Sequence, residues 1–310
     1  MNRKTDFITT LYPTRAAHVA LFLLATIRVI KAPPSPTTLR MSIKSSILLL
    51  ISLCTLSVSA KDYYERVDSA DIYIARNKWA DAERTLKEAL RLEPGNILNS
   101  MLLSNLGYVQ HTQGKLQEAI ESYDVALAMT PNSLVLLKNR ANALIDAGLI
   151  DRAYDDLTAA IDIEPDNQEC RSRHGFVALQ LGKYDSAKAD FETILSLHPS
   201  SADALLGMTI SLDYLGQYDS AIDYATQLID LQKNADNYFT RALLYIKVNN
   251  LPAADDDVRE GLKIDNREGN LYLLRAYLHK LRYRKEEAEI DKKLAIDYNA
   301  DAQLIQQLFP

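Results

Sequence analysis

The 34 residues Ser100–Ser133, SMLLSNLGYVQHTQGKLQEAIESYDVALAMTPNS, decide the fold of this 310-residue chain. Apolar residues recur at helical spacing up to Gly114, a residue type that readily takes the left-handed conformation ending a helix. A second amphipathic run extends from Leu116 to Met129, and Pro131 then stops it. The stretch therefore predicts two antiparallel helices joined by a short turn.

The same pattern recurs along the chain with a period of 34 residues. Three residue types keep this period: Gly114, Gly148, Gly182 and Gly216; Pro131, Pro165 and Pro199; Ala119, Ala153, Ala187 and Ala221. A fixed period of this length predicts stacked two-helix units, because a single short pair cannot bury its own apolar face.

The motif Leu106-Gly107…Ala119-x-x-x-Tyr123…Pro131, repeated as Gly175…Ala187-x-x-x-Phe191…Pro199, resembles the tetratricopeptide repeat. The resemblance implies an all-α fold, a right-handed superhelical solenoid of about seven helix-turn-helix repeats with a short C-terminal capping helix. The expected units are 63–96, 100–133, 134–167, 168–201, 202–234, 235–268 and 269–302, followed by a cap at 303–310.

The pattern is weaker at both ends of the array. Asn77 and Asn249-Asn250 stand where other units have the turn glycine, and Ile97-Leu98-Asn99 is a three-residue insertion that we expect to disturb the stacking locally. Small residues occupy one position of each first helix, with Thr209 as the one large exception.

Residues 41–60 have the features of a signal peptide. Lys44 precedes the apolar run Ile47–Leu56, and the small residues Ser57-Val58-Ser59-Ala60 follow it. We expect cleavage after Ala60 and export to a bacterial periplasm, with no membrane span in the mature chain. The alternative is that this run is a buried helix of the fold. Residues 1–40 are an upstream extension whose translation the sequence does not decide.

The charge balance argues against nucleic acid as a partner. Residues 1–60 hold seven Lys/Arg and one Asp, which leaves 28 basic and 40 acidic side chains in 61–310. A chain that binds a phosphate backbone needs the opposite balance.

Patterns of catalysis, metal binding or cofactor binding are missing from the sequence. His111, His174, His198 and His279 fall in four different units, and only His174 has a ligand-type residue, Cys170, three or four positions away, which is too few for a metal site. Phosphate-binding glycine loops are absent, and Cys170 reads as a small packed side chain. We therefore expect a non-enzymatic protein without metal or cofactor.

One charged pattern predicts structural ion pairs within units. Arg140 and Asp156 are 16 residues apart, and the pairs Arg241 with Asp257 and Arg275 with Asp291 share this spacing. Such positions face each other in an antiparallel helix pair, so we expect these arginines to be occupied rather than free for a ligand.

In the family that the chain resembles, the first helix of each unit lines the concave groove that binds peptides or partner helices. This implies a polar binding zone in the second to fourth units and an apolar zone in the last three. In the polar zone, Tyr108 and Phe176 would supply apolar area beside the polar side chains. The residues of this zone are Asn105, Tyr108, Asn139, Asn142, Arg173 and Phe176, and those of the apolar zone are Leu206, Ile210, Phe239, Leu243, Leu273 and Tyr277. The alternative is that they are ordinary residues of an inner wall.

The predicted function is a protein–protein interaction scaffold of the cell envelope that binds a peptide or partner protein in this groove. The alternative is an accessory component of secretion or surface-glycan machinery, working through the convex face or the array ends. The partner and the oligomeric state stay open.

Overall fold

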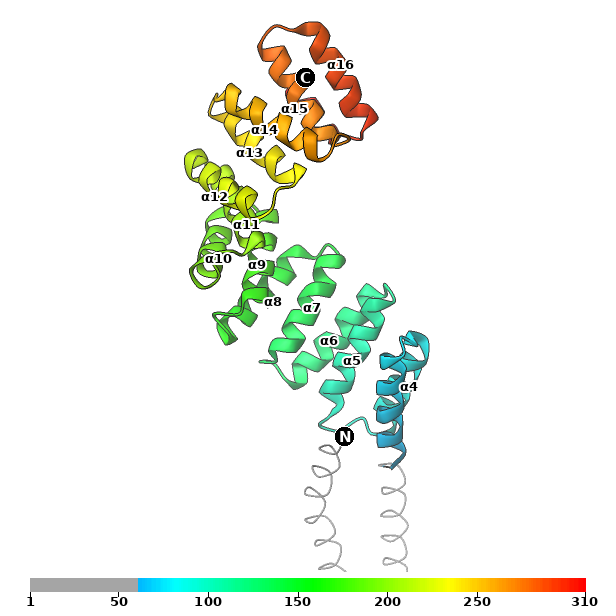
Figure 1. Ribbon diagram of the computed structural model, residues 1–310. Coiled ribbons are helices and arrows are strands. Elements are labelled where there is room, and N and C mark those ends of the chain that lie inside the picture. The colour runs from blue at the N-terminus through cyan, green and yellow to red at the C-terminus, as the bar shows by residue number, and fades with distance from the viewer. Residues whose placement is uncertain (1–60) are drawn as a thin grey trace, which may run out of the picture. The chain divides into compact units, whose positions relative to one another are not determined.

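The computed structural model describes residues 61–310. The predicted signal peptide at 41–60 and the extension at 1–40 lie outside the described residues. The only regular elements within 61–310 are helices, so the all-α prediction is confirmed (Figure 1). After a helix through residues 61–75, they are α4 Trp79–Leu92, α5 Asn99–Thr112, α6 Leu116–Met129, α7 Leu134–Asp146, α8 Ile150–Ile163, α9 Gln168–Gln180, α10 Tyr184–Leu197, α11 Ala202–Tyr214, α12 Tyr218–Leu231, α13 Ala235–Lys247, α14 Leu251–Ile264, α15 Gly269–Leu281, α16 Lys285–Asp297 and α17 Ala302–Leu308.

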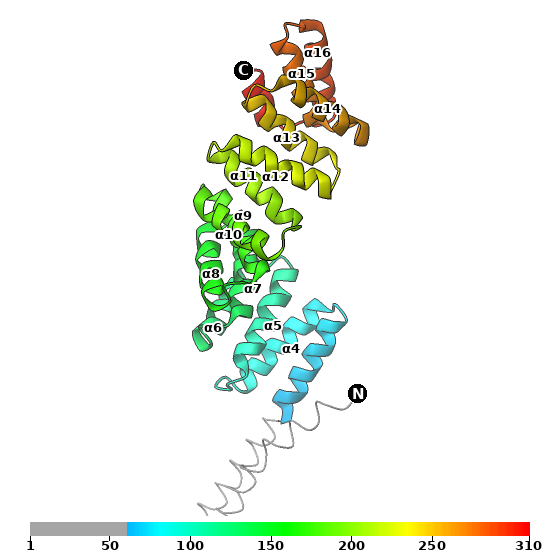
Figure 2. The ribbon, with the colours of Figure 1, turned by 60° about the vertical axis from the view of Figure 1, so that its left-hand side comes forward.

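From α5 to α16 the helices form consecutive antiparallel pairs (Figures 1 and 2). We call α5, α7, α9, α11, α13 and α15 the first helices, and α6, α8, α10, α12, α14 and α16 the second helices. Each first helix packs against the second helix that follows it, and from α7 onward also against the one that precedes it. First helices of successive pairs also contact each other, for example α9 with α11 and α13 with α15.

The turn inside each pair needs one residue with a positive φ angle. Gly114, Gly148, Gly182 and Gly216 supply it with φ between 71° and 75°. Asn77 and Asn249 take the same conformation with φ of 55° and 58°, as asparagine does more readily than most residues. Tyr283, which is 34 residues after Asn249, also has φ 60°, although a bulky side chain disfavours this region.

The turn between pairs has its own periodic signal, which the sequence analysis missed. The residue before each first helix from α7 to α15 accepts a hydrogen bond from a backbone N–H of the first turn. These N-caps are Ser133, Asn167, Ser201, Asn234 and Glu268. Helix α5 lacks such a bond, since the inserted Leu98 stands at its N-cap.

Glycines on the first helices make room for aromatic rings of the second helices. A Cβ atom at Gly107 would lie 2.7 Å from the Tyr123 ring, and one at Gly175 would lie 2.6 Å from the Phe191 ring. Both rings are almost fully buried, with 1% and 0% of their surface exposed. Thr209, the large exception in this series, is completely buried too, and Ala225 stands where Tyr123 and Phe191 stand in their units.

Residues 69–87 and 95–310 form one compact unit. Residues 61–68 and 88–94 belong to a second unit, in which Arg66 Nη1 lies 3.1 Å from Glu88 Oε2. The side-chain contacts described below lie within the first of these two units.

The short helix α17 confirms the expected C-terminal cap. Asp301 caps its N-terminus by accepting hydrogen bonds from the backbone N–H groups of Gln303 and Leu304. Leu308 packs against a cluster built from α13, α14 and α15 that includes Leu274 and Leu278. In Figure 2 the C-terminal helix lies beside these elements.

Candidate binding surface

The first helices bring the predicted polar residues onto neighbouring elements, but only some of them are free. Asn105 on α5 and Asn139 on α7 are half-buried. Neither side-chain amide hydrogen-bonds to another group within residues 61–310. Each amide therefore keeps a donor and an acceptor available to a ligand.

Arg173, the third member of the predicted series, is engaged within the chain. Its Nη1 donates to Asn142 Oδ1 at 2.5 Å, and its Nε lies 3.4 Å from Glu169 Oε1. Glu169 also accepts a hydrogen bond from Lys138 on the neighbouring helix α7. The Lys138 hydrogen bond lowers the pKa of Glu169 below its ordinary value, helped by the charges of Lys138 and Arg173. Arg173 and Asn142 thus tie α9 to α7.

The two predicted aromatic anchors differ in their surroundings. Tyr108 is 46% exposed, and its ring makes an edge contact with Trp79 at a centroid distance of 6.1 Å. Phe176 is half-buried, and its ring lies 5.1 Å from the ring of the core residue Phe191. Tyr108 is therefore accessible to a partner, whereas Phe176 belongs to the packed core.

Further polar contacts connect successive first helices. His111 Nε2 on α5 lies 2.6 Å from Asp146 Oδ2 on α7, and Lys247 Nζ on α13 lies 2.6 Å from Asp213 on α11. Together with the Lys138–Glu169 and Arg173–Asn142 contacts, these ties satisfy much of the polar surface of the first helices. Among the amide and guanidinium side chains of the predicted polar zone, this leaves Asn105 and Asn139 without a partner in residues 61–310.

The three arginine–carboxylate pairs are formed as the 16-residue spacing predicts. Arg140 donates through Nε and Nη2 to Asp156 at 2.8 and 2.6 Å. Arg241 donates two hydrogen bonds to Asp257 through the same two nitrogen atoms, and Arg275 does so to Asp291, at distances of 2.7 to 2.8 Å. The hydrogen bonds that each arginine donates to its aspartate raise the pKa of that arginine above its ordinary value. The pairs hold the two helices of one unit together.

The fourth unit contains a variant of this pair that sequence reasoning missed. His174 Nδ1 lies 2.5 Å from Asp190 Oδ2, and both side chains are buried. Arg171 Nη1 donates to the other Asp190 oxygen at 2.9 Å. His174 stands 34 residues after Arg140, and Asp190 stands 34 residues after Asp156. The 34-residue period therefore places this pair at the same two positions as the Arg140–Asp156 pair.

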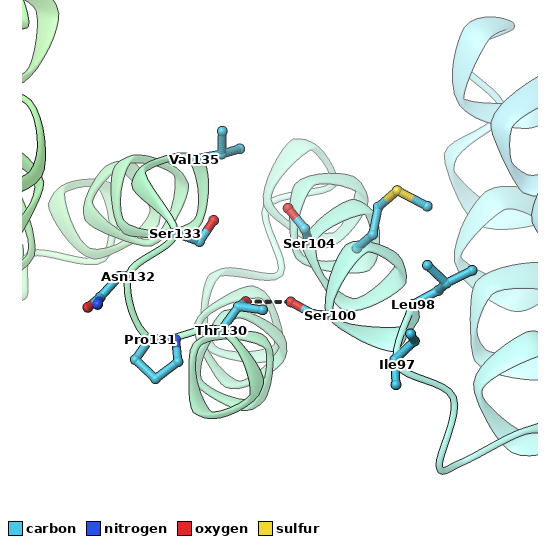
Figure 3. Close-up of a pocket in the computed structure, with 10 residues that line it drawn as sticks. Ile97, Leu98, Ser100, Ser104, Thr130, Pro131, Asn132, Ser133 and Val135 are labelled. Atoms are coloured by element: carbon cyan, nitrogen blue, oxygen red, sulfur yellow. Dashed lines mark hydrogen bonds between the residues drawn. The ribbon is translucent and has the colours of Figure 1, made fainter. Parts of the chain in front are cut away.

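A hollow of about 670 Å³ opens beside the start of α5 (Figure 3). The side chains that line it come from the insertion, from α5, from the turn between α6 and α7, and from the start of α7. They are Ile97, Leu98, Ser100, Met101, Ser104, Thr130, Pro131, Asn132, Ser133 and Val135. Ile97 is 87% exposed, Val135 61% and Met101 52%. The insertion was expected to disturb the stacking, but this exposed apolar hollow was not predicted.

The predicted apolar zone is less open than expected. Leu273 is completely buried, so its assignment to an exposed surface is wrong. The physical reason is that α13 and α15 pack directly against each other and the C-terminal segment adds a further layer. The other five residues of this zone are half-buried: Leu206, Ile210, Phe239, Leu243 and Tyr277.

Residues 61–310 show neither a metal-binding cluster nor a reactive thiol. No group of three or more His, Cys, Asp or Glu side chains within 61–310 is arranged to hold a metal ion. Cys170 is buried, and burial raises the pKa of its thiol, which keeps it in the unreactive form. Nor does any helix of this part combine the length and the apolar character that crossing a membrane requires.

Comparisons with known proteins agree with the repeat geometry. A family model described as tetratricopeptide repeat matches residues 67–133 and 173–236. A solved tetratricopeptide-repeat protein from Parabacteroides merdae is 32% identical to this chain, with a TM-score of 0.62. The match covers 80% of this chain and 97% of the Parabacteroides protein.

More distant proteins share only the fold or a part of the length. YrrB, described as a tetratricopeptide-repeat protein with an unusual peptide-binding site, is 16% identical with a TM-score of 0.54, over 64% of this chain and 97% of its own. PilF of Pseudomonas aeruginosa is 21% identical with a TM-score of 0.53, over 70% and 98%.

A curated protein, the DnaJ homolog subfamily C member 7 homolog of Schizosaccharomyces pombe, is 30% identical over 112 residues. That match spans 32% of this chain and only 23% of the yeast protein. The family follows from the repeat geometry, from the match to the family model, and from the 32% identity across nearly the whole Parabacteroides protein. The chain belongs to the tetratricopeptide-repeat family.

Proposed function

We propose that this protein is a non-enzymatic interaction scaffold that binds an extended peptide or a segment of a partner protein along its first helices. Tetratricopeptide-repeat proteins are interaction scaffolds in general. The description of YrrB as having a peptide-binding site supports a peptide ligand for this chain as well.

One observation carries the proposal. Asn105 and Asn139 present half-buried amides with no hydrogen-bond partner in the described chain, although most polar groups around them are paired. An amide can donate to and accept from the backbone of an extended segment, whatever the sequence of that segment. The two residues are 34 positions apart and thus occupy equivalent places on successive first helices.

The hollow beside α5 supplies apolar area next to these amides. Met101 lies one helical turn before Asn105 on α5, and Val135 lies one turn before Asn139 on α7. Both Met101 and Val135 line the hollow and are more than half exposed. A bound segment would therefore place its backbone on the amides and an apolar side chain in the hollow.

The test compares partner capture by the tagged full chain and by the variant Asn139→Ala. The partner is recovered from envelope extracts, and its affinity is then measured with purified protein. We expect Asn139→Ala to weaken binding by about 1–3 kcal/mol, because a buried polar group of the partner is left without a hydrogen-bond partner. The unfolding midpoint should change little, since the side chain has no intrachain hydrogen bond.

The matched control is Gln227→Ala, which removes an exposed amide from the second helix α12. It should leave affinity unchanged. If Gln227→Ala weakens binding and Asn139→Ala does not, the binding face is the convex one. If Asn139→Ala unfolds the array, the residue is structural and the assignment is wrong.

We also propose export to a bacterial periplasm, with cleavage after Ala60. The support is the basic, apolar and small-residue order of residues 41–60. N-terminal sequencing of the protein recovered from cells should begin at Lys61. An intact Met1 terminus on cytoplasmic protein would contradict this proposal.

A further inference from the structure

We propose that the C-terminal segment Asp301–Pro310 is a built-in occupant of a second docking site, whose external ligand is a short amphipathic helix of a partner protein. The site is the C-terminal wall, which we define as Phe239 and Leu243 on α13 together with Tyr277 on α15. This inference extends the proposed function to a second zone and rests on the array being an interaction scaffold.

The segment contacts one face of α15. The Phe309 ring lies 6.4 Å from the ring of Tyr277, and Lys280 Nζ lies 4.8 Å from the centre of the Phe309 ring. Lys280 also donates to the backbone oxygen of Leu308 at 2.9 Å. Tyr277 and Lys280 are three residues apart on α15 and share one helical face, so the segment lies along that face.

Further contacts reach the neighbouring helices. Leu308 packs on the cluster that also contacts Phe239 and Leu243 of α13. Lys292 Nζ of α16 lies 5.1 Å from the Phe309 ring. The segment begins with a hydrogen bond from the backbone N–H of Asp301 to Asn270 Oδ1 at 2.8 Å. The wall thus already holds a short helix with apolar anchors.

The segment is short and only partly buried. Helix α17 has only seven residues, and none of them is buried. A helix this short is unstable by itself and depends on the surface beneath it. Its apolar residues Leu304, Ile305 and Leu308 remain half-buried, unlike the fully buried leucines of α15. Opening the segment therefore exposes side chains of the segment that are already only partly buried, and it does not require the array to unfold.

The segment itself shows which ligand fits. Its anchors are Leu304, Ile305 and Leu308 on α17 and Phe309 directly after the helix, so a pair of apolar residues is repeated after four positions. The aromatic anchor comes last, between Lys280 and Lys292. The partner segment is thus a short helix with the same apolar spacing and an aromatic residue near its C-terminal end.

Competition with the chain's own segment makes binding conditional. If the wall is free in about 1% of molecules, the apparent dissociation constant of a partner rises about 100-fold. A change that releases the segment restores the intrinsic affinity, so the segment sets the threshold for binding at this end of the array.

The experiment uses a fluorescent peptide with the sequence of residues 301–310, DAQLIQQLFP, and the full chain. The double variant Leu308→Ser/Phe309→Ser keeps the chain length but removes two anchors. The control is Ile290→Ser, which makes a similar apolar-to-polar change at a residue of α16 that is 62% exposed. We expect the peptide to bind the double variant at least tenfold more tightly than it binds the wild type or Ile290→Ser. Adding Tyr277→Ala to the double variant should abolish this gain.

Several results would overturn the proposal. One is an equal peptide affinity for the double variant, the control and the wild type. Another is a gain in peptide affinity that persists after Tyr277→Ala is added. A wild-type dimer that the peptide converts into monomers would show that the segment is exchanged between copies instead of folding back.

A measurement on the wild type covers the case in which the double variant does not fold. Backbone amides of α17 should exchange hydrogen at least tenfold faster than those in the middle of α15. Equal rates would show that the segment does not open separately, which also refutes the proposal. Neither experiment involves Asn105, Asn139 or an external partner, so its failure would leave the proposed function standing.

Discussion

The first helices of residues 100–201 and those of residues 202–302 have the same backbone geometry but different surfaces. In the first region, polar ties such as His111–Asp146 and Lys138–Glu169 connect neighbouring helices, and the apolar residues Met101 and Val135 remain exposed. In the second region, apolar residues dominate, and Leu273 is fully buried. The comparison teaches that one repeat scaffold can keep one zone open and close another, because side-chain identity and a short terminal segment decide exposure.

The largest expected effect contrasts a covered residue with an open one. Leu273→Ala should lower the free energy of unfolding by about 2–5 kcal/mol, because it leaves a cavity in a packed site. Val135→Ala should change it by less than about 0.5 kcal/mol, because Val135 is 61% exposed. Urea unfolding followed by circular dichroism measures both. Equal losses for the two variants would mean that the regions do not differ in burial.

The second-largest expected effect is the loss of folding stability in acid, when the ion pairs of Glu83 near the N-terminal end of the array are broken. Burial alone would raise the pKa of Glu83, but hydrogen bonds from Lys115, Lys87 and Gln113 outweigh it and lower the pKa from 4.5 to about 2. Because the folded-state pKa is lowered, the stabilisation is present above about pH 4.5 and is lost as the pH falls through about 2.

The variant Glu83→Gln should therefore cost about 3 kcal/mol at neutral pH and almost nothing near pH 2. Chemical denaturation at a series of pH values measures this difference. Hydrogen exchange should show that acid loosens α4 and α5 before α15. Glu83 lies on α4, and its partners Gln113 and Lys115 lie in the turn that follows α5. A loss that does not depend on pH would remove the ionic explanation.

The smallest expected effect tests whether the open region is the one that binds. Val135→Asp places a charge in the hollow and should weaken partner binding by more than about 1 kcal/mol. Val125→Asp makes the same change on the second helix α6, at a residue that is 52% exposed, and should leave affinity unchanged. Titration of the purified partner gives both values. If only Val125→Asp weakens binding, the partner uses the opposite face.

Much of the fold was predictable from spacing. The period of Gly114, Gly148, Gly182 and Gly216 predicted the turns, and each glycine has the expected positive φ. The 16-residue spacing predicted the Arg140–Asp156 pair and its two equivalents. The same register would also have revealed the His174–Asp190 pair, had histidine been considered as a replacement for arginine.

The candidate site was less predictable, because exposure depends on distant neighbours. Arg173 and Asn142 were assigned to a ligand, yet they bond to each other across two helices. Phe176 was expected to face a partner, yet its ring contacts the core residue Phe191. The hollow at Ile97 and Val135 arises where an insertion meets a turn more than 30 residues later, and no local pattern announces it.

The sequence by itself determined where each helix begins and ends and which residues repeat at equivalent positions. These properties are local, because glycine turns, proline stops and amphipathic spacing act within about 34 residues. Only the tertiary structure decided which side chains stay open. Leu273 is buried and Val135 is exposed although both stand on first helices, since burial depends on the other segments of the chain that pack over each of them.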